Sequence, residues 1–211
     1  MTAFPREALG GLLDRGMAEL PDVPPEAREL LLDYLALLHR WNRVYNLSAV
    51  RDPAAMVTLH VLDSLVVLPW LRGQRLLDVG SGAGLPGLPL AICRPELAVT
   101  LLDSNSKKTR FLRQCVADLG LANVDVVHAR VEDYRPDALF DCIISRAFAR
   151  TDTFVNSSAG LMAAGGCLLA MKGRPDDDDP GGKAWQSKTM ALAVPGLDAA
   201  RTLVRIEAAT I

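Results

Sequence analysis

Cysteine is scarce in this sequence, and the few cysteines are not arranged to bind a metal. The 211 residues include four cysteines, at positions 93, 115, 142 and 167, and none of them forms a C-x-x-C pair. Widely spaced cysteines, most of them in apolar surroundings, are typical of buried, reduced thiols. We therefore expect neither disulfides nor a metal site, and reduced thiols favour a cytoplasmic protein.

Long apolar runs and an excess of one charge are also missing. The first residues mix Arg6, Glu7, Asp14 and Arg15 with apolar side chains, so we expect no signal peptide. No later run reaches the length of a membrane span, and we expect no membrane partner. The net charge of −2 argues against a protein that coats nucleic acid without specificity.

Basic residues nevertheless gather after several predicted strands. Lys107, Lys108, Arg110 and Arg113 follow the second strand, and Arg146, Arg150, Lys172 and Arg174 lie near later strand ends. Any one group, taken alone, is typical of a solvated face. Because open α/β sheets bind ligands at the carboxyl ends of their strands, the recurrence favours a binding surface.

The residue pattern changes near position 71. Before it, apolar residues recur at helical spacing, with helix starts at Pro24–Glu26 and Asp52–Pro53. After it, strands and helices alternate, which predicts a mostly parallel sheet. The predicted strands are 75–79, 98–103, 124–128, 142–145, 167–171, 189–194 and 201–206, and helices are predicted near 88–92, 107–119 and 152–162. We expect a helical extension at 1–70 packed on an α/β domain at 71–211.

The last part of the predicted sheet has its own signals. Residues 173–182 have no apolar periodicity and contain Asp176–Asp179, so they predict a solvated loop. The last two strands are joined through Pro195–Gly196, which favours an antiparallel hairpin. We therefore expect a seven-stranded, Rossmann-like sheet that is mostly parallel and has an antiparallel last strand.

The segment Leu76–Gly87, which reads LLDVGSGAGLPG, is the most informative part of the sequence. An apolar strand runs into three glycines spaced two apart and then into a predicted helix. Glycine lets the backbone turn sharply and approach a ligand, and the N–H groups that open a helix donate hydrogen bonds to it. A turn that binds no ligand seldom needs such spacing. The segment therefore indicates a loop that cradles a nucleotide.

Two classes of cofactor fit this loop. Gly82-x-Gly84-x-x-Gly87, with Asp103 about 20 residues further on, resembles the dinucleotide fingerprint. Read from Asp78, as acid-x-Gly-x-Gly-x-Gly, the loop resembles the S-adenosylmethionine loop of class I methyltransferases. We favour the second class, because a carboxylate suits a cofactor with an ammonium and a sulfonium but repels a pyrophosphate. The cofactor-binding residues predicted in this segment are Asp78, Gly80, Ser81, Gly82, Gly84 and Leu85.

Two further strand ends supply candidate cofactor contacts. Asp103 ends an apolar strand, where its carboxylate can accept both hydroxyls of a ribose. The alternative role for Asp103 is an N-cap of the next helix, although Ser104 or Asn105 can fill that position. After the third predicted strand, Val131 can pack on an adenine face and Glu132 can accept from its amino group. The candidates here are Asp103, Ser104, Val131 and Glu132.

The fourth predicted strand leads into Ser145–Ala149, where we expect the substrate. Arg146 can clamp a phosphate or donate to the acceptor atoms of guanine, and Phe148 can stack on a base. In the alternative interpretation Arg146 pairs with a surface acid and Phe148 fills the core. Lys172, just beyond the fifth predicted strand, is a second candidate for holding a phosphate.

Six blocks of the sequence, in order, resemble a known family. They are Tyr45–Pro53, His60–Leu65, Leu77–Leu90, Leu101–Ser104, Ser145–Ala149 and Met171–Gly173. In these blocks the chain is similar to the glucose-inhibited division protein B family, which are bacterial guanine-N7 methyltransferases of 16S ribosomal RNA. The resemblance implies an S-adenosyl-L-methionine site lined by Gly80, Leu85, Val131, Glu132 and Arg146. It also implies that Asn46, His60 and Asp63 lie beside the active-site cleft.

The reaction that the resemblance implies needs no general base. Guanine N7 carries an unprotonated lone pair at neutral pH, so methyl transfer needs only alignment of the reacting atoms. Arg146 and Lys172 are then expected to position 16S ribosomal RNA, within a small ribosomal subunit or an assembly intermediate, for a monomeric enzyme. Three other functions fit parts of the sequence: a nicotinamide-dependent oxidoreductase, a small-molecule methyltransferase and a non-enzymatic RNA-binding factor.

Overall fold

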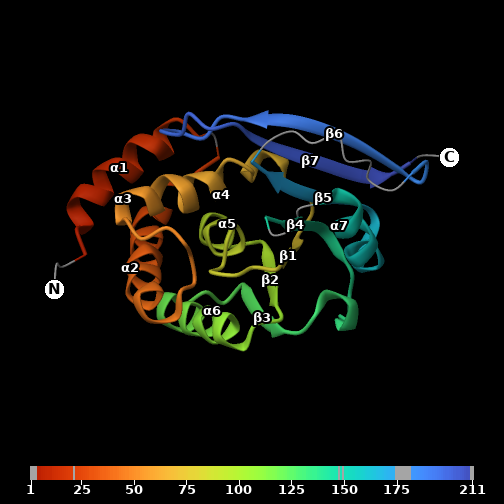
Figure 1. Ribbon diagram of the computed structural model, residues 1–211, viewed down its shortest axis with the longest axis horizontal. Helices are drawn as coiled ribbons and strands as arrows, with labels where there is room; N and C mark the ends of the chain where they lie inside the picture. The colour runs from red at the N-terminus through yellow and green to blue at the C-terminus, as the bar shows by residue number, and fades with distance from the viewer. Residues whose placement is uncertain (1–3, 21, 147, 149, 174–181, 210–211) are drawn as a thin grey trace.

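The computed structural model describes residues 4–20, 22–146, 148, 150–173 and 182–209. Seven strands form a sheet in the order β3-β2-β1-β4-β5-β7-β6, with helices on both faces (Figure 1). The strands are β1 (Arg75–Val79), β2 (Ala98–Asp103), β3 (Val124–His128), β4 (Phe140–Ser145), β5 (Met162–Lys172), β6 (Trp185–Leu192) and β7 (Arg201–Ala208). The predicted aspartate-rich loop falls largely at 174–181, outside the described residues.

The pairing of the strands fixes where ligands can bind. β1 lies between β2 and β4 and is parallel to both, whereas β7 is antiparallel to β5 and to β6. The predicted seven-stranded sheet with its antiparallel end is thus confirmed. After β1 the chain adds β2 and β3 on one side of it, and then crosses to add β4 on the other side. The sheet therefore has a topological switch point between β1 and β4. Ligands of open α/β sheets bind in the crevice at that point.

The helices cover the two faces of the sheet unequally. They are α1 (Arg6–Ala18), α2 (Arg28–Tyr45), α3 (Pro53–Met56), α4 (Asp63–Leu65), α5 (Gly87–Cys93), α6 (Ser106–Leu119) and α7 (Thr151–Ser158). Apolar residues of α1, α2, α5 and α6 form one core cluster with residues of the sheet, while α7 covers the other face. Strands buried on both faces account for the nearly continuous apolar sequences of β1, β2 and β4.

The prediction of a helix over 152–162 was wrong at its C-terminal end. α7 ends at Ser158, a short 3₁₀ turn covers Ala159–Leu161, and Met162 already begins β5. β5 carries two adjacent glycines, and Gly165 has a φ of +75° that a side chain would disfavour. The alanines and glycines at the start of β5 have little strand propensity, so sequence pattern alone does not place this strand start.

The helical stretch Pro53–Trp70 begins at a well-capped turn and then widens. The side chain of Asp52 accepts the N–H of Ala55 at 2.9 Å, and Pro53 occupies the first turn. Residues Val57–Leu62 form a π-helical turn, a geometry frequent at functional sites. Contrary to the sequence prediction, this stretch is long and apolar enough to cross a membrane, but 61% of its residues are buried inside the protein. It therefore has the character of a core helix.

Candidate active site

The glycine loop between β1 and α5 is held from both sides. The N–H groups of Gly80 and Ser81 donate to the carbonyl of Leu102 in β2, at 2.8 and 3.1 Å. From the other side, the buried hydroxyl of Tyr34 in α2 donates to the carbonyl of Ala83 at 2.8 Å. Gly80 and Gly82 have φ values of +72° and +59°, which side chains rarely tolerate. The loop therefore presents bare backbone in a fixed shape.

Asp78 lies fully buried beneath this loop. Its Oδ2 accepts the N–H of Gly87 at 3.0 Å, and its Oδ1 has no hydrogen-bond partner among the described residues. Burial raises the pKa of Asp78 to about 7. Asp78 is not among the residues that line the three cavities described below, and its carboxylate lies beneath the loop backbone. An orphaned carboxylate oxygen here suits a cationic ligand, whose charge would favour the ionised form.

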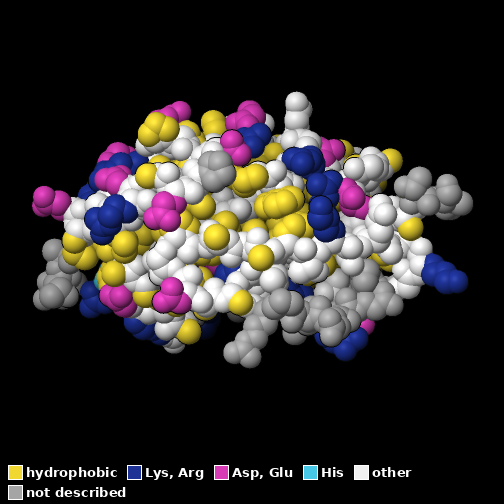
Figure 2. Space-filling view, turned by 90° about the horizontal axis from the view of Figure 1, so that it is seen from above, with side chains coloured by type: hydrophobic (Ala, Val, Ile, Leu, Met, Phe, Trp, Pro, Cys, Tyr) yellow, Lys and Arg dark blue, Asp and Glu magenta, His cyan; other side chains and the backbone are white. Residues whose placement is uncertain are grey.

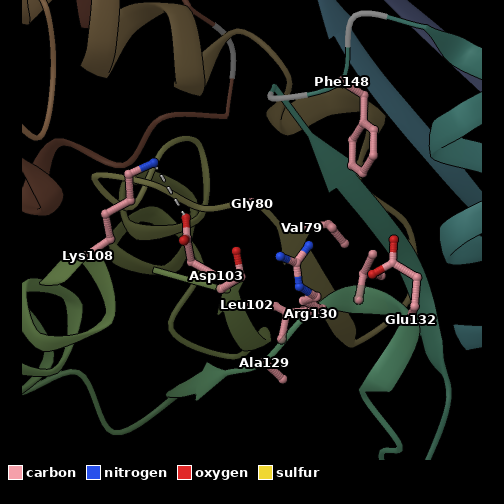
Figure 3. Close-up of a pocket in the computed structure, with 11 residues that line it drawn as sticks. Val79, Gly80, Leu102, Asp103, Lys108, Ala129, Arg130, Glu132 and Phe148 are labelled. Carbon is pink, nitrogen blue, oxygen red and sulfur yellow. Dashed lines mark ion pairs between the residues drawn. The ribbon is translucent and has the colours of Figure 1, made fainter. Parts of the chain in front are cut away.

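A first cavity of about 310 Å³ opens at the carboxyl ends of β1, β2 and β3. The predicted residues that line it are Gly80, Asp103, Ser104, Val131, Glu132 and Phe148. In Figure 3, Asp103 and Glu132 lie on opposite sides of the cavity, with Arg130 between them. The carboxyl edge of the sheet thus brings together side chains from three separate strand ends.

Asp103 holds the glycine loop and also lines the first cavity. Its Oδ2 accepts the N–H of Gly82 and its Oδ1 accepts the N–H of Asn105, both at 2.8 Å. The N-cap of α6 is Asn105, whose side chain accepts the N–H groups of Lys107 and Lys108, so the alternative role of Asp103 as N-cap was wrong. Because each carboxylate oxygen has two lone pairs, Asp103 can still accept ribose hydroxyls.

Two cationic residues of this cavity were not predicted individually. Lys108 places its Nζ 3.9 Å from Oδ2 of Asp103 (Figure 3), and Arg130 follows β3. Lys108 lies in the first turn of α6, so it belongs to the basic group after β2 that the sequence did show. Its position three residues after the N-cap is the signal that places it beside the strand end.

Two further cavities continue the first. One of about 170 Å³ lies between Ser48 and the glycine loop and is lined by Gly80, Ser81, Gly82, Leu85 and Arg146. The other, of about 340 Å³, is lined by residues that include His60, Asp63, Arg146, Lys172 and Arg201. Gly80 borders the first and second cavities, and Arg146 borders the second and third. The three cavities therefore follow one another from β3 to β7.

Arg146 connects the loop after β4 to the helical stretch Pro53–Trp70. Its NH1 donates to Oδ2 of Asp63 and to the carbonyl of Leu59, both at 3.1 Å. The side chain of Asp63 is only 4% exposed, so the interpretation of Arg146 as partner of a surface acid was wrong. The carbonyl of Leu59 belongs to the π-helical turn, where the wider winding shifts the regular hydrogen bonds.

Three other predicted residues, Phe148, Lys172 and Asn46, differ in whether they line one of the three cavities. Phe148 packs on Phe154, with ring centroids 5.2 Å apart, and lines the first cavity. Lys172 is buried at the end of β5 and lines the third cavity. Asn46 accepts a hydrogen bond from Arg51 and is not among the residues that line the three cavities.

His60 is held in a fixed, neutral form. Its Nδ1 donates to the carbonyl of Leu59 at 2.9 Å, so its Nε2 accepts the hydroxyl of Ser48 at 2.8 Å. Burial lowers the pKa of His60, which keeps the ring uncharged at neutral pH. With both ring nitrogens engaged, His60 connects Ser48 of the second cavity to the third cavity.

The site fits S-adenosyl-L-methionine better than a dinucleotide. The buried carboxylate of Asp78 lies beneath the glycine loop, where a pyrophosphate would be repelled. An added Cβ at Gly82 would meet no atom closer than 3.7 Å, so the loop surface is open to a ligand. The sheet order, the glycine loop and the acidic end of β2 together define a class I S-adenosylmethionine-dependent methyltransferase.

Comparison with known proteins places the chain within that class. Residues 27–201 match the family GidB, rRNA small subunit methyltransferase G, and the chain belongs to this family. A Ribosomal RNA small subunit methyltransferase G of Methylobacillus flagellatus is 54% identical over 93% of this chain and 97% of its own. That of Chromohalobacter salexigens is also 54% identical, over 93% of this chain and 96% of its own. The protein is therefore a methyltransferase, as the sequence blocks predicted.

Solved structures support the fold. An O-methyltransferase, TomG, from Streptomyces achromogenes, in complex with S-adenosylmethionine, has a TM-score of 0.58 at 15% identity and covers 99% of this chain and 100% of its own. TrmN from Thermus thermophilus has a TM-score of 0.53 at 18% identity, over 80% of this chain and 53% of its own. At such identities the likeness concerns the fold alone, and it agrees with the predicted class.

Proposed function

We propose that this protein transfers the methyl group of S-adenosyl-L-methionine to N7 of a guanine in 16S ribosomal RNA. The observation that carries the proposal is the row of three cavities linked by Gly80 and Arg146, in a chain of the GidB family. A donor whose adenosine occupies the first cavity reaches the second with its methionine part. The third cavity then takes the nucleotide that receives the methyl group.

The chain's own groups are arranged to hold the donor. Asp103 accepts the ribose hydroxyls, Val131 packs on the adenine, and Glu132 accepts from its amino group. Gly80 and Gly82 let the backbone approach the methionine part, while the charge of Asp78 lies beneath it. The bound donor supplies an electrophilic methyl group on a sulfonium.

The residues near the methyl position orient the substrate rather than move a proton. Guanine N7 attacks with its own lone pair, so a base is not required. His60, the histidine of the third cavity, has both ring nitrogens engaged and its pKa lowered by burial. The site therefore accelerates the reaction by alignment, which can supply a large part of the barrier reduction.

Because N7 of guanine is the reacting atom, Arg146 can donate hydrogen bonds to only part of the base. Arginine commonly binds guanine through O6 and N7 together, but here N7 must stay free to attack. The NH1 of Arg146 is fixed by Asp63 and by the carbonyl of Leu59. Its other nitrogens are thus directed to O6 or to a phosphate, and Lys172 in the same cavity assists.

The surface charge favours a structured RNA substrate. On the face seen in Figure 2, Lys and Arg side chains lie in groups interspersed with Asp and Glu. With a net charge of −2, the whole chain is not expected to bind extended RNA tightly, so the substrate is proposed to be 16S RNA shaped by a small subunit or an assembly intermediate. The proposal includes a cytoplasmic enzyme that acts as a monomer, because one chain supplies all the lining residues.

Mass mapping of ribosomal RNA tests the proposal directly. Small subunits from cells that lack the protein are incubated with purified protein and S-adenosyl-L-methionine, and one guanine is expected to gain 14 daltons, roughly the mass of a methylene, at N7. Arg146→Ala is expected to lower methyl transfer far more than it lowers the affinity for the donor, which calorimetry measures. Transfer that occurs without RNA and is insensitive to salt would favour a small-molecule substrate instead. Binding of a nicotinamide cofactor in place of the donor would contradict the proposal.

A further inference from the structure

The third cavity contains a buried carboxylate that two arginines share. Oδ1 of Asp63 accepts Nε–H of Arg201 at 2.8 Å, and Oδ2 accepts NH1 of Arg146 at 3.1 Å. The side chain of Asp63 is 4% exposed, whereas those of Arg146 and Arg201 are 28% and 23% exposed. Both guanidinium groups therefore reach the cavity, while the carboxylate lies behind them.

The three residues come from separate parts of the fold. Asp63 begins α4, Arg146 follows β4, and Arg201 begins β7. NH1 of Arg146 also donates to the carbonyl of Leu59, and NH1 of Arg201 donates to the carbonyl of Ala200 at 3.0 Å. Within the described ranges the NH2 groups of both arginines make no hydrogen bond to the protein. Donors thus remain on the cavity side of each guanidinium.

The arrangement is suited to an anion with several acceptor oxygens. One carboxylate balances only one of the two guanidinium charges, so this pair retains a net positive charge. Guanidinium groups are planar forks that match carboxylate and phosphate oxygens. Because Asp63 occupies one edge of each fork, it fixes both side chains and reduces the conformational entropy that ligand binding would otherwise cost.

We propose that Arg146 and Arg201 clamp one phosphate of the RNA substrate, and that Asp63 is the positioning residue that aligns them. The inference rests on the proposed function and extends it to a particular contact. A phosphate is favoured over a base edge. On the edge of guanine that carries N7, only O6 remains as an acceptor when N7 reacts, whereas two guanidinium groups offer several donors. The clamp thus fixes the backbone of the target nucleotide and places its base toward the second cavity.

Four variants separate this clamp from a structural ion pair. Arg201→Gln removes the charge, Arg201→Lys keeps the charge but loses the fork, and Asp63→Asn keeps the shape of the side chain without its charge. Arg205→Gln is the matched control, because Arg205 lies on the same strand and pairs with Glu207 but does not line the cavity. For each variant, kcat and KM with small subunits and the salt dependence of RNA binding are measured, with donor affinity by calorimetry as the check on folding.

The expected results differ among the variants. Arg201→Gln reduces the slope of log affinity against log salt by about 0.7 to 0.9, the loss of one phosphate contact. Arg201→Lys keeps that slope but lowers kcat, because a point charge does not hold the phosphate in a fixed plane. Asp63→Asn keeps the slope and lowers kcat roughly 10- to 100-fold, as expected for misplaced reacting groups. Arg205→Gln leaves all three measurements unchanged.

Three outcomes would overturn the inference. The clamp is wrong if Arg201→Gln has the same salt slope as Arg205→Gln, or if Arg201→Lys keeps the wild-type kcat. A positioning role for Asp63 is wrong if Asp63→Asn turns over at the wild-type rate while binding the donor normally. Failure of the proposed function is recognised separately, because wild-type protein would then methylate no guanine although the salt slopes of RNA binding still differed.

Discussion

The hydroxyl of Tyr34 donates a 2.8 Å hydrogen bond to the carbonyl oxygen of Ala83, and both groups are buried. Tyr34 lies in α2, and Ala83 lies in the middle of the glycine loop. The helical part of the chain thus contacts the very backbone that is proposed to hold the methyl donor. Residues more than forty positions away in the sequence therefore contribute to the shape of the cofactor site.

Tyr34→Phe tests this connection. The variant leaves the carbonyl of Ala83 without a donor in a buried place, which costs about 1 to 3 kcal/mol of the free energy of unfolding. We also expect the dissociation constant for S-adenosyl-L-methionine to rise several-fold, because the loop loses one of its fixed points. Denaturant unfolding and calorimetry measure the two effects. Tyr45→Phe, at an exposed tyrosine of the same helix, is the control and is expected to change neither quantity.

The buried carboxylate of Asp78 gives the stability of the free protein a definite pH dependence. Burial raises its pKa from 3.8 to about 7, so the folded protein binds a proton that the unfolded chain has lost. The free energy of unfolding is therefore expected to fall as pH rises from about 4 to about 7, by at most about 1.4 kcal/mol per pH unit from this group. Denaturant titrations across that range measure it. Asp78→Asn should remove this component and exposed Asp137→Asn should not; identical profiles for both variants would contradict the assignment.

Binding of the methyl donor is expected to release protons near neutral pH through the same residue. A cationic ligand above Asp78 favours the ionised carboxylate, so the pKa of Asp78 falls when the donor binds. Calorimetry in buffers of different ionisation enthalpy measures the number of protons released. Wild-type protein should release more protons than Asp78→Asn. Equal proton release by the wild-type protein and Asp78→Asn would show that donor binding does not change the pKa of Asp78.

The strand ends explain why so many residues of the first cavity were predictable. Gly80, Asp103 and Val131 each follow an apolar strand, and parallel strands bring their carboxyl ends to one edge of the sheet. Local sequence therefore determines both the residue and its place. The same argument predicted the parallel strands of the sheet, which the structure confirms, but it was silent on Arg130, which has no local signal beyond its charge.

The surroundings of Arg146 were less predictable, because the contacts there join distant segments. The partner of Arg146 is Asp63, which lies 83 residues earlier, and Arg201 reaches the same carboxylate from the other end of the chain. No spacing rule links three such positions, and pairing of Arg146 with a surface acid was an open alternative from the sequence. The π-helical turn that presents the carbonyl of Leu59 also follows from packing rather than from local propensity.

Gly87→Ala is expected to lower the free energy of unfolding by steric overlap beneath the glycine loop. A Cβ at Gly87 would overlap the side chain of Leu101 and lie 2.7 Å from Oδ2 of Asp78. Such overpacking costs about 1 to 3 kcal/mol of the free energy of unfolding and moves the N–H that Asp78 accepts. Gly160→Ala, where an added Cβ would meet no atom within 4 Å, is the control. Thermal unfolding of the two variants measures the difference, and equal melting temperatures would contradict the packing argument.

The helices before residue 71 are expected to be required for folding of the domain at 71–211. The division of the chain at that position remains a prediction from sequence, whereas the structure shows one apolar cluster that includes Leu13 and Leu35 together with Leu76 of β1. Removing residues 1–70 would expose the face of α5 and α6 that α2 covers, and the lost burial is about 25 cal/mol for each Å² of apolar surface. We expect the fragment 71–211 to be aggregated or to lack fixed tertiary structure by near-ultraviolet circular dichroism. Co-expression of 1–70 as a separate chain should restore donor binding, whereas a monomeric 71–211 that unfolds cooperatively and binds the donor alone would show that the helices are dispensable.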